Sequence, residues 1–338
     1  MIIVMKRGAS QEEVAHVESR IQELGLESHP IVGEERVVIG AIGEDRAKVE
    51  LQALSSAPGV DKVMPILQPF KLASRELQEA DSHIQVRDIT IGNDLFLVIA
   101  GPCSVESRDQ LMTTARAVKK AGAHMLRGGA FKPRTSPYSF QGMEEEGLKL
   151  LAEARDETGM AVVTEVMNPR DIELVASYAD ILQIGARNMS NFSLLKELGA
   201  IDKPILLKRG MMSTVKELLM SAEYIIASGN KKVILCERGI RTFEDMTRNT
   251  LDLSVVPLLR QLCHLPVIVD PTHATGKPAL VPWMSKASVA AGANGIIVEV
   301  HPDPEKALSD GDQALRPHEF DALMGDISRY APLEQKHV

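Results

Sequence analysis

Short apolar runs and longer amphipathic segments alternate along most of the chain, from residue 95 to residue 300. The runs are continuous stretches of Val, Ile, Leu and Ala, which is typical of strands buried on both faces. In chain order they read LFLVIAG, HMLRGG, AVVTEV, ILQIGA, PILLKRG, KVILCERG, PVIVDPTH and GIIVEVHP. Segments between them, such as 108–121, 145–157 and 214–227, have apolar residues at helical spacing. Parallel strands need helical crossovers. Eight such units in about 250 residues therefore predict an α/β fold, the (β/α)8 TIM barrel.

An open, doubly wound parallel sheet is the alternative architecture for this pattern. Such sheets often carry a GxGxxG motif after the first strand. The segment that follows LFLVIAG contains no such motif, which favours the barrel.

The first 67 residues have a different pattern. MIIVMK, ESHPIV, RVVIGAIG and VDKVMPIL read as four strands, and 11–24 and 45–54 read as helices. Ser10 is a good N-cap for the first helix, and Glu13 completes a capping box. The resulting order, βαββαβ, predicts a small α+β ferredoxin-like domain.

We therefore expect three parts: a ferredoxin-like domain at 1–67, a linker at 68–81 and a TIM-barrel catalytic domain at 82–338. A strand pair, IQVRDITIG, is expected at the start of the third part. The small domain has no cluster of catalytic residue types. It is interpreted as regulatory or as an oligomer contact, and a purely structural appendage is the alternative.

All eight apolar runs end in polar or ionisable residues. In a TIM barrel the carboxyl ends of the strands form the active-site mouth. The residues in chain order are Cys103, Ser104, Arg127, Glu165, Gln183, Lys208, Arg209, Glu237, Arg238, Asp270, Glu299 and His301. Any one of them could form a salt bridge at the rim. Because all eight runs end in this way, an active site is the better interpretation.

Cations dominate these strand ends and the loops that follow. The stretch 126–142, LRGGAFKPRTSPYSFQG, is basic, rich in hydroxyls and kept out of helix by Gly and Pro. Taken alone it could be a solvated surface loop. The whole cationic set is Arg127, Lys132, Arg134, Arg187, Lys208 and Arg238. Gathering these at one mouth of an acidic protein predicts substrates with several negative charges, such as phosphates with a carboxylate.

A second set has metal-ligand character. It contains Cys103, His273 and Glu299 near strand ends and Asp310 on the following loop. A thiolate, an imidazole and two carboxylates would make a mixed divalent-metal site. No local CxxC or HxxxH spacing supports the set, and Cys103 taken alone could be a small buried hydrophobe.

Composition excludes several classes of function. The net charge is −8, and no basic face or arm predicts binding to nucleic acid. No apolar run approaches the roughly 20 residues of a membrane span. The N-terminus lacks signal-peptide character, and three scattered cysteines do not form a disulfide framework. We expect a cytoplasmic protein with reduced thiols.

Several long motifs together resemble one enzyme family. They are AGPCSVES, LRGGAFKPRTSPYSFQG, QIGARNM, LLKRGM, LCERGIRTFE, VDPTHATG and IIVEVHPDPEKALSDG. The chain resembles 3-deoxy-D-arabino-heptulosonate 7-phosphate (DAHP) synthase, and more narrowly its type I beta branch, in which a ferredoxin-like domain can precede the barrel. The resemblance implies a transferase that condenses phosphoenolpyruvate with erythrose 4-phosphate and releases phosphate, the first step of the shikimate pathway to chorismate and the aromatic amino acids.

The resemblance also assigns residues. Cys103, His273, Glu299 and Asp310 match the ligands of a divalent ion such as Mn, Fe, Co or Zn, and no organic cofactor is implied. The phosphoenolpyruvate site matches Arg127, Lys132, Arg187, Lys208 and Arg238. Arg134 and Thr135 match the site for the aldose phosphate. Lys208 and Glu165 are candidate proton carriers or water positioners. Feedback inhibition by tyrosine or phenylalanine and a homotetramer are expected on the same basis.

Two other functions remain possible from the sequence. One is the sister reaction with arabinose 5-phosphate, which makes 3-deoxy-D-manno-octulosonate 8-phosphate. That family usually differs where KPRTSPYSF stands here. The other is a non-catalytic sensor of phosphorylated metabolites, for which a set of metal ligands would be unnecessary.

Overall fold

The computed structural model describes residues 1–33, 36–43, 48–64, 69–132, 136 and 138–338. The chain forms two compact units. One is Met1–Asp81 with Leu262–His264, and the other is Ser82–Gln261 with Leu265–Val338. No helix in the described ranges is long and apolar enough to cross a membrane.

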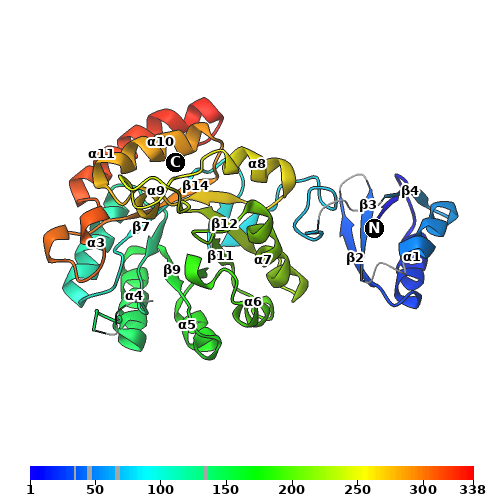
Figure 1. Ribbon diagram of the computed structural model, residues 1–338, viewed down its shortest axis with the longest axis horizontal. Helices are drawn as coiled ribbons and strands as arrows, with labels where there is room; N and C mark the ends of the chain where they lie inside the picture. Colours follow the sequence, from blue (N-terminus) through cyan, green and yellow to red (C-terminus); the bar gives the residue numbers. More distant parts are fainter. Residues whose placement is uncertain (34–35, 44–47, 65–68, 133–135, 137) are drawn as a thin grey trace. The chain divides into compact units, whose positions relative to one another are not determined.

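The first unit is a four-stranded antiparallel sheet with helices (Figure 1). Its elements are β1 (Ile2–Met5), α1 (Gln11–Glu23), β2 (Glu27–Val32), β3 (Val37–Ile42), α2 (Lys48–Leu51), a 3₁₀ helix (Gln52–Ser56) and β4 (Val60–Met64). The strand order β2-β3-β1-β4 and the βαββαβ sequence of elements confirm the predicted ferredoxin-like class. The core contains Ile3, Met5, Val17, Ile21 and Ile39, all fully buried.

Local signals set the ends of α1. The Ser10 side chain accepts a bond from the backbone of Glu13, whose carboxylate accepts one from the backbone of Ser10. This is the predicted capping box. The second helix differs from the expected 45–54: it begins at Lys48 in the described part and tightens into 3₁₀ geometry from Gln52. Short 3₁₀ turns are common at helix ends. The part of that prediction on residues 44–47 lies outside the described residues.

The second unit opens with a hairpin and then forms a closed barrel. β5 (Ile84–Val86) pairs antiparallel with β6 (Ile89–Ile91), as expected. The barrel strands are β7 (Leu97–Gly101), β8 (Met125–Arg127), β9 (Ala161–Glu165), β10 (Ile181–Ile184), β11 (Ile205–Lys208), β12 (Val233–Glu237), β13 (Val267–Val269) and β14 (Gly295–Glu299). Each is parallel to its neighbours, and β14 pairs with β7 to close the ring. The predicted eight-stranded barrel is confirmed.

Helices cover the outside of the barrel (Figure 1). They are α3 (Arg108–Lys120), α4 (Glu144–Thr158), α5 (Ile172–Tyr178), α6 (Phe192–Gly199), α7 (Val215–Ala227), α8 (Val255–Leu262), α10 (Val281–Ala290) and α11 (Pro317–Tyr330). The five-residue helix α9 (Pro271–Thr275) instead follows β13 at the carboxyl end of the barrel and carries His273. The second unit also contains short 3₁₀ turns: Pro169–Asp171, Ala186–Asn188, Pro278–Leu280, Pro304–Lys306, Gly311–Gln313 and Ala331–Glu334.

One end of the barrel is filled by apolar side chains. Ile84, Val86 and Ile91 of the hairpin pack in one cluster with inward residues of the strands, such as Leu97 and Ile181. These strand residues lie at or near the amino ends of their strands. The hairpin therefore seals that end, and the carboxyl end remains for polar side chains.

Candidate active site

Strand geometry decides which polar residues face the interior of the barrel. Side chains alternate between faces with a period of two. Met125, Leu206 and Ile268 belong to the interior cluster. The next inward positions are therefore Arg127, Lys208 and Asp270. The same alternation on four other strands turns further side chains inward: Glu165, Gln183, Arg238 and Glu299.

The first strand has no side chain at the corresponding position. Gly101 stands there with φ +155°, and a Cβ on it would lie 2.1 Å from the carbonyl oxygen of Arg127. Only glycine permits this close approach of two backbones. The first side chain that β7 contributes to the mouth is therefore Cys103.

Two of the strand-end residues lie on the opposite face. Arg209 and Glu237 form a buried ion pair, with 2.9 Å between NH1 and Oε2. NH1 also lies 3.1 Å from Asp252 Oδ2, and the backbone N–H of Gly239 donates to Glu237 Oε1 at 2.7 Å. Burial raises the pKa of Glu237, although Arg209 acts in the opposite direction. This pair braces the loop after β12 and does not line the pocket.

A pocket occupies the carboxyl end of the barrel. Its lining residues are Arg127, Lys132, Glu165, Gln183, Gly185, Ala186, Arg187, Lys208, Met211, Arg238, Arg241, Arg248, Asn249, His273 and Asp310. Seven of them are Arg or Lys. Nε of Arg127 is buried and has no hydrogen-bond partner among the described residues. A cavity with this excess of donors is suited to an anion with several charged oxygens.

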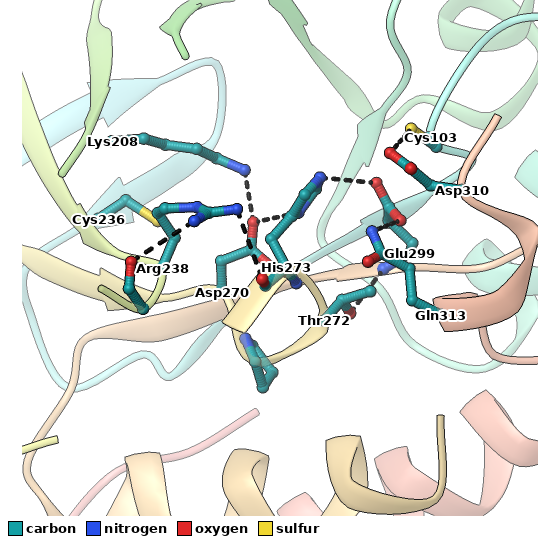
Figure 2. A network of polar contacts seen from close by, with 12 residues as sticks. Cys103, Lys208, Cys236, Arg238, Asp270, Thr272, His273, Glu299, Asp310 and Gln313 are labelled. Carbon is teal, nitrogen blue, oxygen red and sulfur yellow. Dashed lines mark hydrogen bonds and ion pairs between the residues drawn. The ribbon is translucent and has the colours of Figure 1, made fainter. Parts of the chain in front are cut away.

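A buried chain of polar contacts runs from Lys208 to His273 (Figure 2). Lys208 Nζ lies 2.5 Å from Asp270 Oδ2, which is also 2.7 Å from His273 Nδ1. Burial alone would raise the pKa of Asp270, but His273 and Lys208 outweigh it and hold that pKa well below its usual value. Burial lowers the pKa of His273, although Asp270 and Glu299 act in the opposite direction. A neutral imidazole leaves Nε2 available as a metal ligand.

The four residues of the metal-ligand set come together at this end of the barrel. One candidate ligand atom from each of Cys103, His273, Glu299 and Asp310 lies within 4.8 Å of the others. Cys103 Sγ is 3.3 Å from Asp310 Oδ2, and His273 Nε2 is 3.2 Å from Glu299 Oε1. Sulfur, imidazole nitrogen and carboxylate oxygen suit a divalent transition metal. The residues present therefore fit such an ion.

The charges around this group are balanced by neighbouring cations. Burial raises the pKa of Glu299, but His273 and Arg127 outweigh it, and the net effect lowers the pKa. Burial, followed by Glu299, raises the pKa of the Cys103 thiol to about 11, although Lys132 and Arg127 act in the opposite direction. Lys132 Nζ is 3.0 Å from Cys103 Sγ. Metal binding would displace the thiol proton, because the thiolate is the ligand.

A hydrogen-bonded clamp holds the two loops that carry Cys103 and Asp310. Glu106 Oε1 accepts bonds from Ser104 Oγ and from the backbone N–H of Leu308. Its Oε2 lies 3.3 Å from His301 Nε2. The backbone N–H of Asp303 donates to His301 Nδ1, so Nε2 carries the proton that faces Glu106. His301 therefore helps to hold the two loops together through Glu106 and is not among the residues that line the pocket.

The structure brings most of the predicted residues together. The pocket or the metal-ligand group includes Cys103, Arg127, Lys132, Glu165, Arg187, Lys208, Arg238, His273, Glu299 and Asp310. Arg134 and Thr135 lie outside the described residues. Sequence motifs did not single out four further lining residues, Met211, Arg241, Arg248 and Asn249, or Gln313 beside Glu299. Their position on loops after barrel strands was the available signal.

Together, the closed barrel, the cationic pocket and the adjoining Cys/His/Glu/Asp group define a TIM-barrel protein with a site suited to anionic ligands. The chain belongs to the DAHP synthetase I family, whose model matches residues 72–331. Residues 1–68 match the DAHP synthase ferredoxin-like domain. The recognition of this family from sequence motifs is confirmed, and the chain is an enzyme of the DAHP synthase class, a transferase.

Relatives and solved structures agree with this assignment. The chain is 53% identical over 331 residues to phospho-2-dehydro-3-deoxyheptonate aldolase of Thermotoga maritima, with 98% of each chain covered. A crystal structure of that DAHP synthase from Thermotoga maritima superposes with a TM-score of 0.80 at 51% identity, covering 100% of this chain and 98% of the other. A 2-dehydro-3-deoxyphosphooctonate aldolase of Stenotrophomonas maltophilia is 31% identical, over 74% of this chain and 96% of its own length.

Proposed function

We propose that the protein is a metal-dependent 3-deoxy-7-phosphoheptulonate synthase. It condenses phosphoenolpyruvate, erythrose 4-phosphate and water into DAHP and phosphate, as the first step of the shikimate pathway. One observation carries the proposal: a pocket with seven cations adjoins a Cys/His/Glu/Asp group at the same barrel mouth. Both substrates are phosphates and one also has a carboxylate, so a donor-rich pocket suits them.

The cations divide between the two substrates. Arg127, Lys132, Arg187, Lys208 and Arg238 hold phosphoenolpyruvate. The free Nε of buried Arg127 supports this assignment, because an unpaired buried donor is costly unless a ligand satisfies it. Arg134 and Thr135 hold the phosphate of the aldose, an assignment that rests on the KPRT motif alone.

Cys103, His273, Glu299 and Asp310 would hold the metal ion, which is Mn, Fe, Co, Zn or a similar divalent ion. When bound, it would act as a Lewis acid on the aldehyde carbonyl. The chain's own residues orient the two substrates in reacting geometry, a contribution that can be worth several kcal/mol. No organic cofactor takes part.

Proton handling falls to Lys208 and Glu165, which end strands β11 and β9 on either side of β10. Lys208 Nζ donates to Asp270 Oδ2 at 2.5 Å, which fixes the position of Nζ at the pocket. Glu165 Oε2 accepts a bond from Gln183 Nε2 at 3.2 Å. Its other oxygen has no such bond within the described part of the chain and can hold a water or a proton. Carbon 3 of phosphoenolpyruvate attacks the aldehyde, water adds to carbon 2, and phosphate leaves by C–O cleavage.

The sister reaction with arabinose 5-phosphate is the competing assignment, because relatives named 2-dehydro-3-deoxyphosphooctonate aldolase share about a third of their residues with this chain. A product assay decides between them. Purified protein is incubated with phosphoenolpyruvate and each aldose phosphate, with and without a chelator. We expect DAHP from erythrose 4-phosphate only, and loss of product with the chelator. Turnover of arabinose 5-phosphate alone would refute the proposal.

The N-terminal unit would regulate the barrel. We propose feedback inhibition by tyrosine or phenylalanine through the ferredoxin-like domain at 1–67, with the linker at 68–81 and the catalytic domain at 82–338. An effector shifts such an element only if it binds one of its states better than the other. We also propose that the protein is a homotetramer and lies in the cytoplasm.

A further inference from the structure

Gln313 is a buried residue that contacts the metal-ligand group without belonging to it. It ends the 3₁₀ turn Gly311–Gln313, directly after Asp310, and its side chain is 3% exposed. Its Nε2 lies 2.6 Å from Glu299 Oε2, and its Oε1 lies 2.6 Å from NH1 of Arg248 (Figure 2 shows the contact with Glu299).

The chemistry of the two neighbours fixes the orientation of this amide. An ionised carboxylate only accepts hydrogen bonds, and a guanidinium only donates them. The NH₂ group of Gln313 must therefore face Glu299, and its oxygen must face Arg248. Among the common side chains of this size, only an amide meets both demands. A carboxylate would repel Glu299, and an apolar side chain would satisfy neither neighbour.

The bond from Gln313 makes the two oxygens of Glu299 unequal. Oε2 accepts the hydrogen bond from the Gln313 amide. Oε1 is the oxygen that lies 3.2 Å from His273 Nε2 and 3.0 Å from Arg127 NH1. Only one oxygen of Glu299 is therefore turned toward the other candidate ligands.

Arg248 connects this arrangement to the pocket. It lines the pocket, and its NH1 lies 3.5 Å from Asp310 Oδ1 in addition to its bond with Gln313. Asp310 has φ +50°, a left-handed conformation that costs energy for a residue other than glycine. Bonds to Arg248 and the turn that ends at Gln313 hold the loop in this conformation.

We propose that Gln313 is a positioning residue for the metal site. Its amide makes Glu299 a ligand through Oε1 alone, and Arg248 locks that amide from the pocket side. The inference rests on the proposed metal site. Partners of metal ligands commonly matter in this way, and their loss typically costs about 10- to 100-fold in metal affinity.

Binding of Co²⁺ to the full-length protein tests the proposal. The visible absorption of Co²⁺ reports the number and arrangement of its ligands, and a thiolate-to-cobalt band reports Cys103. For Gln313→Met, which keeps the volume and removes the amide, we expect the Co²⁺ dissociation constant to rise about 10- to 100-fold. We also expect a changed spectrum, because Glu299 can then offer both oxygens. Gln313→Glu should change the spectrum as well, with a side chain of the same shape.

Gln183→Met is the matched control. Gln183 is also buried and also donates to a carboxylate, Glu165, but this pair lies outside the metal-ligand group. It should keep the affinity and the spectrum of the wild type. The proposal is overturned if both Gln313 variants bind Co²⁺ as the wild type does, or if Gln183→Met changes binding equally. A wild type that binds no Co²⁺ would overturn the proposed metal site together with this inference.

Discussion

Asp270 holds His273 at two points. Its Oδ1 accepts a bond from the backbone N–H of His273 at 2.9 Å, and its Oδ2 lies 2.7 Å from Nδ1 of the ring. The first contact caps the start of α9 and the second fixes the ring. Because Nδ1 is engaged, Nε2 is the atom turned toward Glu299. A short helix cap therefore decides which imidazole nitrogen is offered to a metal.

Replacing Asp270 should weaken metal binding. Asp270→Asn removes the negative charge that faces Lys208 and can turn an NH₂ group toward the ring. We expect the affinity for a divalent metal to fall about 10- to 100-fold. Stability should also fall, because breaking a buried pair costs on the order of 3–5 kcal/mol. Chelator competition measures the first effect and urea unfolding the second.

Asp252→Asn is the control for that variant. Asp252 pairs with Arg209 outside the pocket, so its loss should leave metal affinity unchanged. Equal metal affinity in Asp270→Asn and in the wild type would contradict the positioning role of Asp270.

Cys103 should be essential for turnover and dispensable for folding. Cys103→Ala removes the thiolate from the proposed ligand set and leaves a small residue in a buried position. We expect most activity to be lost while the circular dichroism spectrum is retained. Chelation of the wild type should abolish turnover, and added divalent metal should restore it. Full activity of Cys103→Ala, or of thoroughly demetallated enzyme, would be incompatible with the proposed metal site.

Arg134 should determine the affinity for the aldose phosphate. Loss of a charge-assisted bidentate contact costs on the order of 1.5–3 kcal/mol, or roughly ten- to a hundredfold. Arg134→Ala should raise the KM for erythrose 4-phosphate by about that factor, with a much smaller effect on phosphoenolpyruvate. Arg187→Ala should show the reverse pattern. Steady-state kinetics with each substrate varied in turn would test this. Equal changes in KM for both substrates would rule out the assignment of Arg134 to one substrate and Arg187 to the other.

His124 should make the stability of the barrel fall in mild acid. Its Nδ1 accepts a bond from the backbone N–H of Val98 at 3.0 Å, which requires a neutral ring. Burial lowers the pKa of His124, and the neighbouring side chains of His337 and Lys119 lower it further. Asp94 faces this group of side chains, with its Oδ2 3.4 Å from His337 Nδ1.

The direction of the effect follows from these contacts. In the folded protein the pKa of His124 lies below 6.5, the usual value for histidine. The unfolded chain therefore binds the proton more readily. The contribution of His124 is present above pH 6.5 and is lost as the pH falls through the folded pKa. Asn can accept the same bond without titrating. Urea unfolding of His124→Asn should therefore show a flatter pH dependence below 6.5, whereas His318→Asn, at an exposed position, should not. Identical pH profiles for wild type and His124→Asn would disprove this.

The sequence predicted the barrel and the residues that gather at its mouth better than it predicted which of their side chains face inward. Capping of α1 could be predicted because Ser10 and Glu13 interact within one turn. The sequence did not show that Lys208 and Arg238 point into the barrel while Arg209 and Glu237 point away from it. Strands that are apolar on both faces lack the alternation of polar and apolar residues that would reveal the inward face. Gln313 was missed for a different reason: its partners, Glu299 and Arg248, are 14 and 65 residues away, and only the folded chain brings them together.

The last prediction concerns the ferredoxin-like domain. Its apolar core is a cluster distinct from that of the barrel, and all the described site residues come from the second unit. A protein that begins at Ser74 should therefore fold and keep its activity. It should lose inhibition by tyrosine or phenylalanine, because the proposed regulatory domain has been removed. Rates with and without each aromatic amino acid, for the full-length and the shortened protein, test this. Inhibition that survives the truncation would place the effector site on the barrel, and a full-length enzyme insensitive to all three aromatic amino acids would leave the domain as an oligomer contact or a stabilising appendage.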